Sequence, residues 1–323
     1  MNILARTALR RARPAEAPSA FARDVIEGLS TPQKYLLAKH FYDAAGSRLF
    51  EEITALPEYY PTRTELGILR AHAAAIVGPV RPGTTVVEFG SGATTKVRVL
   101  LAAVPQIAAY VPVDISVEFL NGEAVRLKRD FPLLEVLPVA ADFSGLFELP
   151  RHVRARPLVG FFPGSTIGNF EPPAAAAFLR RAAGILGPGA ALVVGVDLVK
   201  DSAVLDAAYD DAAGVTARFN LNILARINRE LGGNFDLDAF THRAFFDREH
   251  SRIEMHLVSR VDQQARVAGH TFAFQTGETI HTENSYKYTC ESFAALAADA
   301  GWTARAVFTD AKDYFSVHAL TLK

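Results

Sequence analysis

A glycine-rich turn at the end of an apolar run is the feature that most constrains this chain. The segment Val86-Val87-Glu88-Phe89-Gly90-Ser91-Gly92-Ala93-Thr94-Thr95-Lys96 predicts a strand that ends in E-x-G-x-G and opens a helix. Glycines at such a turn let the backbone bend sharply and approach a ligand that a Cβ atom would exclude. The same kind of turn closes many strands that bind nothing, so its interpretation depends on the rest of the chain.

From residue 84 onward, short apolar runs alternate with longer helical patterns. This alternation predicts an α/β fold: a doubly wound, Rossmann-like, mostly parallel sheet with helices on both faces. Two strand-like runs near the C-terminus, joined by a polar turn at 309–313, predict an antiparallel hairpin that closes the sheet. The expected strands cover residues 85–89, 108–113, 135–140, 158–162, 191–196, 303–308 and 314–322.

Two regions break this alternation and predict a second, smaller α+β domain. Residues 21–63 are helical and aromatic-rich, whereas 201–286 hold one long helical stretch, 206–231, followed by alternating strands. The predicted organisation is a disordered basic tail at 1–20, a larger domain of 64–198 plus 287–323, and a smaller domain of 21–63 plus 199–286.

The charge balance argues against a nucleic-acid binder. The 323 residues include 34 Lys and Arg against 35 Asp and Glu, and no basic stripe follows residue 13. The arginines up to that point are expected in a frayed tail, with an organelle presequence as the alternative; they are Arg6, Arg10, Arg11 and Arg13. The longest apolar run, 185–196, is broken by glycines and a proline, so no membrane span is expected.

Cysteine and histidine usage bears on compartment and metals. The single cysteine, Cys290, cannot form an internal disulfide, and the nine histidines form no Cys/His set with zinc spacing. We therefore expect a reducing, cytoplasmic compartment and a site without metal.

The residues after the next two strands favour an adenosine ligand. Asp114 ends the second strand, 22 residues after Gly92, where a carboxylate can accept both hydroxyls of a ribose. Asp142 and Phe143 follow the third strand and could hold the edge and face of an adenine. Because the full G-x-G-x-x-G spacing and a pyrophosphate cradle are missing, S-adenosylmethionine fits this pattern better than NAD.

The loop after the fourth strand carries a further candidate. Residues 161–170 include two glycines and Asn169, at the edge where doubly wound folds bind ligands. Asn169 could meet a substrate amine or carboxylate, or it could satisfy the backbone of the turn. Earlier in the chain, Thr62 and Glu65 predict a capping box that starts a helix running to Val77.

Several long segments share the motifs of one family. Besides the Gly90 and Asn169 loops, they are Tyr42–Phe50, Leu56–Glu65, Gly195–Asp201, Phe219–Asn222, Ile253–His256 and Thr282–Tyr288. Together they closely resemble the histidine N-alpha-methyltransferases of ergothioneine biosynthesis. The resemblance runs from about residue 21 to the C-terminus and leaves out only the basic tail.

The resemblance implies transfer of three methyl groups from S-adenosylmethionine to the α-amino group of L-histidine, giving hercynine, by a monomer with an inserted substrate domain. It puts the cofactor positions on Gly90, Lys96, Asp114, Asp142 and Phe143. It puts the substrate positions on Tyr59, Asn169, Tyr209, Glu283 and Ser285, with Met255 beside the imidazole and Tyr42 near the amine. The resemblance also implies that Tyr42 and Asn169 have the catalytic role. A carboxylate such as Glu283 can accept an imidazole N–H and so favour histidine.

Other interpretations stay open on the sequence alone. Without the family, Met255 is a core residue on an inward strand face, Glu283 a solvated charge, and the tyrosines packing residues. A methyltransferase of the same family could act on another amino acid, such as tryptophan, but Met255 and Glu283 match the histidine type. An NAD-dependent oxidoreductase is another alternative, but the third glycine of its binding motif is missing here. A non-catalytic sensor would bind the adenosine ligand without methyl transfer.

Overall fold

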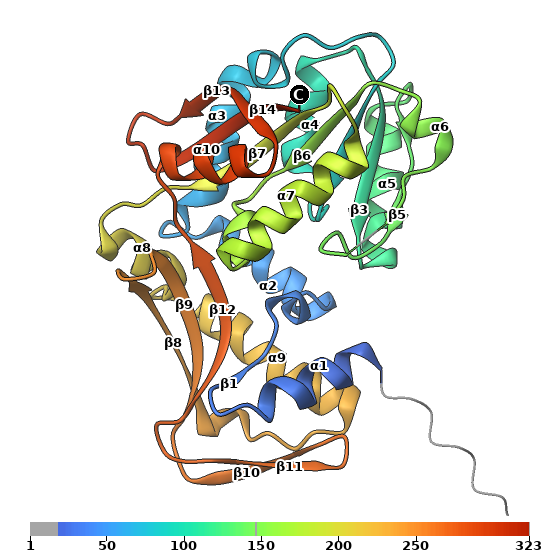
Figure 1. The fold of residues 1–323 in the computed structure, drawn as a ribbon. Coiled ribbons are helices and arrows are strands. Elements are labelled where there is room, and N and C mark those ends of the chain that lie inside the picture. Colours follow the sequence, from blue (N-terminus) through green and yellow to red (C-terminus); the bar gives the residue numbers. More distant parts are fainter. Residues whose placement is uncertain (1–18, 146, 323) are drawn as a thin grey trace, which may run out of the picture.

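The computed structural model describes residues 19–145 and 147–322, which form two parts (Figure 1). A large sheet with its helices makes up the upper part in this view, and a smaller sheet with its helices makes up the lower part. Helix α1 (Ala20–Leu29) begins directly after Ser19, whose hydroxyl accepts a hydrogen bond from the Ala22 N–H. The arginines of the expected basic tail lie outside the described residues.

The large sheet is mostly parallel. Its order is β13-β14-β7-β6-β2-β3-β4, and β5 also pairs with β3. Strands β2 to β7 pair in parallel, whereas β14 runs antiparallel to both β7 and β13. The predicted doubly wound sheet with an antiparallel C-terminal hairpin is confirmed. The strands are β2 (Thr84–Phe89), β3 (Ile107–Asp114), β4 (Glu135–Val136), β5 (Val139–Ala140), β6 (Leu158–Phe162), β7 (Ala191–Asp197), β13 (Trp302–Thr309) and β14 (Phe315–Leu322).

Helices cover both faces of this sheet. They are α3 (Tyr60–Val77), α4 (Thr95–Ala103), α5 (Val117–Asp130), α6 (Arg151–Arg154), the 3₁₀ helix η2 (Thr166–Asn169), α7 (Pro172–Leu186) and α10 (Cys290–Asp299). On one face, α7 and α10 bury Phe178 and Phe293 in a core that includes Trp302. On the other face, α3 and α4 bury Leu69 and Val97 in a second core. Burial on both sides explains why these strands are continuous apolar runs.

The lower part has one core of its own. It has a four-stranded sheet of order β1-β12-β9-β8 and a separate hairpin, β10-β11. Its strands are β1 (Lys34–Tyr35), β8 (Phe240–Asp247), β9 (Arg252–Ser259), β10 (Gln263–Val267), β11 (His270–Phe274) and β12 (Thr279–Tyr286). Besides α1, its helices are η1 (Ala38–Phe41), α2 (Ala44–Ala55), α8 (Ser202–Tyr209), α9 (Val215–Leu231) and η3 (Leu237–Ala239). Among the described residues, no helix is both long and apolar enough to cross a bilayer.

Two expected elements are divided in the structure. The single helix expected over 206–231 is wrong: α8 and α9 are separate, and Gly214 between them has φ +67°. The Asp211 carboxylate accepts the N–H groups of Val215 and Thr216 and so starts α9 anew. The strand expected over 135–140 is two short strands, β4 and β5, which flank Pro138. Proline has no N–H to donate to the ladder.

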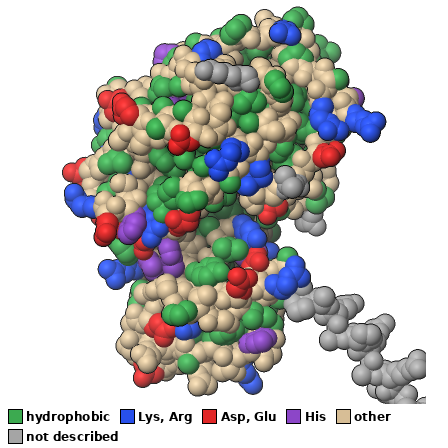
Figure 2. Space-filling model, viewed as in Figure 1, with side chains coloured by type: hydrophobic (Ala, Val, Ile, Leu, Met, Phe, Trp, Pro, Cys, Tyr) green, Lys and Arg blue, Asp and Glu red, His purple; other side chains and the backbone are tan. Residues whose placement is uncertain are grey.

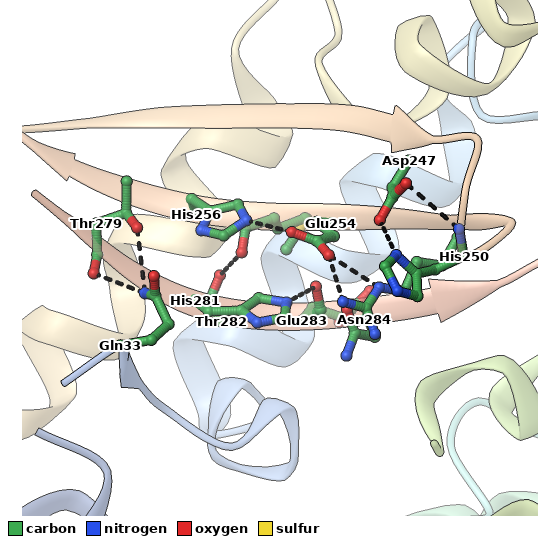
Figure 3. A network of polar contacts seen from close by, with 12 residues as sticks. Gln33, Asp247, His250, Glu254, His256, Thr279, His281, Thr282, Glu283 and Asn284 are labelled. Atoms are coloured by element: carbon green, nitrogen blue, oxygen red, sulfur yellow. Dashed lines mark hydrogen bonds and ion pairs between the residues drawn. The ribbon is translucent and has the colours of Figure 1, made fainter. Parts of the chain in front are cut away.

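A β-bulge at Thr282 decides which side chains of β12 face the core of the lower part. His281 stands opposite His256 on β9, and Glu283 stands opposite Met255, the residue before it. Thr282 is therefore the extra residue, and its hydroxyl donates to the Met255 carbonyl over 3.0 Å (Figure 3). Neighbouring residues of β9 point to opposite faces, so His281 and Glu283 also do, although they are two residues apart.

Candidate active site

The Gly90 turn connects β2 to α4 and is tightly held. The N–H groups of Gly90 and Ser91 both donate to the Val113 carbonyl on β3, over 2.9 and 3.1 Å. Gly90 has φ +72°, and a Cβ atom there would lie 2.9 Å from Cε1 of Phe143. Only glycine fits this conformation and this contact. The turn and the Phe143 ring thus form one wall.

Lys96 forms an ion pair with Glu65, which the sequence had placed in a capping box. Its Nζ lies 2.6 Å from Oε2 of Glu65, a fully buried side chain of α3. The same carboxylate accepts the N–H of Gly164, in the loop after β6. The expected capping box is wrong: α3 begins at Tyr60, and its N-cap residue Tyr59 makes no side-chain cap. Glu65 faces inward, where it fixes Lys96 and the Gly164 loop together.

Asp114 is the last residue of β3, and Asp142 follows the end of the neighbouring strand β5 by two residues. Asp114 accepts the N–H of Ser116, and burial raises the pKa of its carboxyl despite that bond. Asp142 is exposed and accepts both the N–H and the hydroxyl of Ser144. Oxygen acceptors at these two strand ends, beside the Gly90 and Phe143 wall, fit a nucleoside with free hydroxyls.

Aromatic rings from four helical segments and their flanks form the opposite wall. Tyr42, at the end of η1, packs edge-on against Phe50 at 5.6 Å between ring centroids, and Phe50 packs against Tyr59 at 6.2 Å. Tyr59 in turn contacts Tyr209 of α8 at 6.3 Å. Tyr42 is 39 % exposed and so lies at the rim of this wall. Desolvation within the site, then the Glu283 carboxylate, raise the pKa of Tyr42 well above its usual range, so its hydroxyl stays protonated.

Glu283 brings an acid to the same wall. The bulge places it on the face of Met255, which is almost wholly buried. Desolvation raises the pKa of Glu283 to about 7, although the Lys287 ammonium opposes this shift. Within the described residues, the Glu283 carboxylate makes no hydrogen bond. Glu283 is half-buried, and its carboxylate is free to accept a donor from a ligand.

Ser285 and Tyr209 belong to a buried network that crosses between the two parts. Their hydroxyl oxygens lie 2.8 Å apart. Lys287 donates to both, over 2.7 Å to Ser285 and 3.0 Å to Tyr209, and pairs with Asp197 at 2.8 Å. Asp197 ends β7 and also binds Lys200 and the Tyr60 hydroxyl; those contacts are 2.6 Å to Lys200 and 2.8 and 2.9 Å to Tyr60.

Asn169 ends η2 and lies beside β12. Gly168, the residue before it, approaches the Tyr286 backbone so closely that a Cβ atom would lie 2.6 Å from its carbonyl oxygen. The Asn169 side chain is half-buried and makes no hydrogen bond in the described part of the chain. Its amide therefore does not hydrogen-bond the backbone of the turn, which was the alternative interpretation, and it is available to a ligand.

The structure thus brings Tyr42, Tyr59, Tyr209, Met255, Glu283 and Ser285 to one wall. Gly90 with Phe143, and Lys96 with Glu65, form a second group, and Asp114 and Glu65 are close enough to raise the pKa of Tyr42 and of Tyr59, respectively. Asp142 and Asn169 contact none of these side chains through a hydrogen bond within the described residues. Between the two parts the molecule narrows (Figure 2).

The sequence predicted no role at the site for Glu65, Asp197, Lys200 and Lys287, and it placed Glu65 in a helix cap instead. A signal was present for two of them. Asp197 ends an apolar strand, and Lys287 continues the alternation that begins with Glu283 and Ser285. An ionisable residue at an inward position of a strand is unusual unless it is paired.

The other face of β9 and β12 carries a second polar cluster (Figure 3). Glu254 accepts from Arg252 and bonds His256 at 2.8 Å, and the ring of His256 stacks on that of His281 at 4.7 Å and 15°. One nitrogen or oxygen of each of Glu254, His256 and His281 lies within 4.8 Å of the others. Two of the ring nitrogens have hydrogen-bond partners, since Nε2 of His256 bonds Glu254 and Nε2 of His281 lies 3.1 Å from the Glu283 carbonyl oxygen.

The sequence of this chain is similar to those of known proteins over most of its length. Residues 21–322 match the family described as "Histidine-specific methyltransferase, SAM-dependent". A histidine N-alpha-methyltransferase of Mycolicibacterium smegmatis is 45 % identical over 88 % of this chain and 89 % of its own, and one of Mycobacterium tuberculosis is 44 % identical over 87 % and 88 %. Ergothioneine biosynthesis protein 1 of Neurospora crassa is 29 % identical over 84 % of this chain and 32 % of its own. The chain therefore belongs to the histidine-specific, S-adenosylmethionine-dependent methyltransferases.

Proposed function

We infer that this protein transfers three methyl groups from S-adenosylmethionine to the α-amino nitrogen of L-histidine, giving hercynine, as the first step of ergothioneine biosynthesis. Membership of the histidine-specific family over residues 21–322 is the observation that carries this inference. The names of the mycobacterial relatives and of the Neurospora protein support it. A role as an NAD-dependent oxidoreductase does not agree with that membership.

The methyl donor is assigned to the wall formed by the Gly90 turn. Phe143, packed on the Gly90 turn, offers an aromatic face, Asp114 and Asp142 offer acceptors for hydroxyl and amino groups, and Lys96 offers a cation for a carboxylate. When bound, S-adenosylmethionine supplies a methyl group that its sulfonium already activates. The proposed reaction therefore needs no metal.

The substrate is assigned to the facing wall. Glu283 accepts an N–H of the imidazole, and Met255 packs beside the ring. Tyr59, Tyr209, Ser285 and Asn169 offer donors to the carboxylate and the amine. A ligand without the imidazole N–H would leave the desolvated Glu283 carboxylate unpaired, which costs about 1–3 kcal/mol. This cost favours histidine over apolar amino acids.

Tyr42 and Asn169 are assigned to the amine. An ammonium has no lone pair, so the nitrogen must lose a proton before each transfer. Because the pKa of Tyr42 is raised, its hydroxyl is not the base at neutral pH. It instead accepts or donates a hydrogen bond that aims the amine lone pair. Holding nitrogen, methyl carbon and sulfur in line can contribute up to roughly 7–11 kcal/mol.

The domain organisation, the oligomeric state and the compartment are also part of the proposal. Residues 64–198 plus 287–323 form the donor-binding domain, and 21–63 plus 199–286 form the substrate domain. One buried core contains side chains from Phe21 to Tyr60 and from Leu205 to Ile280, which supports the second unit. We propose a monomer in a reducing cytoplasm without nucleic-acid or membrane partners, in keeping with one cysteine and a net charge of −1.

Mass spectrometry tests the function. The purified protein is incubated with S-adenosylmethionine and all twenty amino acids. A mass increase of about 42 on histidine alone supports the proposal, because each of the three methyl groups replaces a hydrogen and adds about 14 mass units. Methylation of tryptophan or another amino acid keeps the enzyme and the donor but replaces the substrate. Donor binding without any methylated amino acid would favour the sensor alternative.

A further inference from the structure

Lys287 is a fully buried lysine whose three N–H groups all have acceptors. None of its side chain is exposed. Nζ lies 2.7 Å from Oγ of Ser285, 3.0 Å from the hydroxyl oxygen of Tyr209 and 2.8 Å from Oδ2 of Asp197. A buried ammonium is costly unless each N–H is bonded. The three bonds use all its donors, so Lys287 itself has none left for a substrate.

The three bonds fix the direction of the neighbouring hydroxyls. An ammonium can only donate, so the oxygens of Ser285 and Tyr209 both accept from Lys287. These two hydroxyls lie 2.8 Å apart, and one of their protons occupies the bond between them. The other proton has no acceptor in the network. Whichever residue carries it, the pair presents an O–H donor to a third group.

The Lys287 ammonium stands beside carboxylates. Asp197 contacts both Lys287 and Lys200. Burial disfavours its charge, but the two ammonium groups outweigh burial and lower the pKa of Asp197. The Lys287 ammonium also opposes the burial that raises the pKa of Glu283. Such an ammonium behind a pair of O–H donors is complementary to an anion such as a carboxylate.

We propose that Lys287 is a positioning residue that makes the Ser285 and Tyr209 hydroxyls donors toward the carboxylate of the amino-acid substrate. This inference rests on the proposed function. In this proposal, Lys287 does not touch the substrate, yet it is responsible for the preference for an amino acid over the corresponding amine or alcohol. Lys200 binds the same Asp197 but touches neither Ser285 nor Tyr209, so it provides a matched control.

The test compares two ligands on three proteins. L-histidine and L-histidinol, which has an alcohol in place of the carboxylate, are titrated calorimetrically into the wild type, Lys287→Met and Lys200→Met, each saturated with S-adenosylhomocysteine. We expect Lys287→Met to weaken histidine at least tenfold and histidinol less than threefold, with S-adenosylhomocysteine affinity kept within twofold. Lys200→Met should weaken both ligands by less than threefold. In a Tyr209→Phe background, Lys287→Met should cost histidine less than in the wild type.

Other outcomes overturn the inference. Equal losses for histidine and histidinol, or equal losses in the two lysine variants, would give Lys287 only a structural role. Lys287→Gln keeps a neutral donor and is measured if Lys287→Met does not fold. If neither variant folds while Lys200→Met does, Lys287 serves the fold and the inference falls. If the wild type neither binds nor methylates histidine, the proposed function falls with it, and the wild-type control alone shows this.

Discussion

Glu65 of α3 and Lys96 of α4 form an ion pair, with 2.6 Å between Oε2 and Nζ, and the Glu65 carboxylate also receives the Gly164 N–H. One acid thus fixes a cation and a loop of the donor site. Removing its charge leaves Lys96 without its counter-charge. We expect Glu65→Gln to destabilise the fold by about 1–3 kcal/mol and to weaken S-adenosylmethionine about tenfold. Thermal unfolding and calorimetry measure these effects; unchanged donor affinity would contradict the role of Glu65.

Gly90→Ala tests the donor wall. An alanine at φ +72° is strained, and its Cβ would lie 2.9 Å from the Phe143 ring. We expect donor affinity to fall at least tenfold by calorimetry. Gly184→Ala is the control: it lies within α7, and a Cβ there meets nothing within 4 Å. That change should leave donor affinity unaltered and stabilise the fold by about 0.5–1 kcal/mol. Equal donor binding in both variants would refute the assignment.

Glu283→Gln tests the pH dependence of substrate recognition. The pKa of Glu283 is raised to about 7, so the carboxylate is lost as the pH falls through 7. We expect kcat/KM for histidine to fall below pH 7 in the wild type. The limb near pH 7 should be missing from the Glu283→Gln profile, whereas titration of the substrate amine remains. A variant profile with the same limb would show that another group titrates there.

Tyr42→Phe tests the orientation of the amine. As methyl groups accumulate, the amine loses the N–H donors that the Tyr42 hydroxyl could accept, so the three transfers depend on Tyr42 to different extents. We expect the proportions of mono-, di- and trimethylated histidine to change more than histidine binding does. Tyr59→Phe should instead raise the KM for histidine. Unchanged product ratios with a large loss of binding in Tyr42→Phe would contradict this assignment.

Glu88→Gln tests buried charge under the Gly90 turn. Burial raises the pKa of Glu88 to about 8, although the Tyr110 hydroxyl, 2.5 Å away, and Lys96 oppose the shift. A raised carboxyl pKa means that the folded state holds its proton longer than the unfolded state. Wild-type stability should therefore fall from about pH 4.5 to pH 8. In ligand-free protein, Glu88→Gln should be relatively more stable at pH 8 than at pH 5. Chemical unfolding at both values decides this.

The sequence predicted the fold where its signals are local. Buried parallel strands are continuous apolar runs, so β2, β6 and β7 were expected within two residues of their bounds. The break between α8 and α9 was missed because the helical patterns on both sides outweighed the turn signals of Asp211 and Gly214, which mark the break in the structure.

The site depended on a different kind of signal. Tyr42 and Tyr59 are ordinary aromatic residues by pattern, and only the family motifs gave them roles. Glu65 fitted a capping box by spacing, because its true partner, Lys96, is distant in sequence and met only through the packing of α3 on α4. Lys287 was missed for the same reason: Asp197 lies on another sheet.

The bulge at Thr282 has an evolutionary consequence. If Thr282 took a place in the ladder, the strict alternation of β12 would turn Glu283, Ser285 and Lys287 together to the opposite face. Because the bulge absorbs the extra residue, the loss of one codon here leaves these side chains on their present face, whereas a residue inserted into the regular ladder exchanges the whole set. Efforts to redesign the preferred amino acid of such enzymes should therefore keep this bulge while they vary the identity of the residues around it.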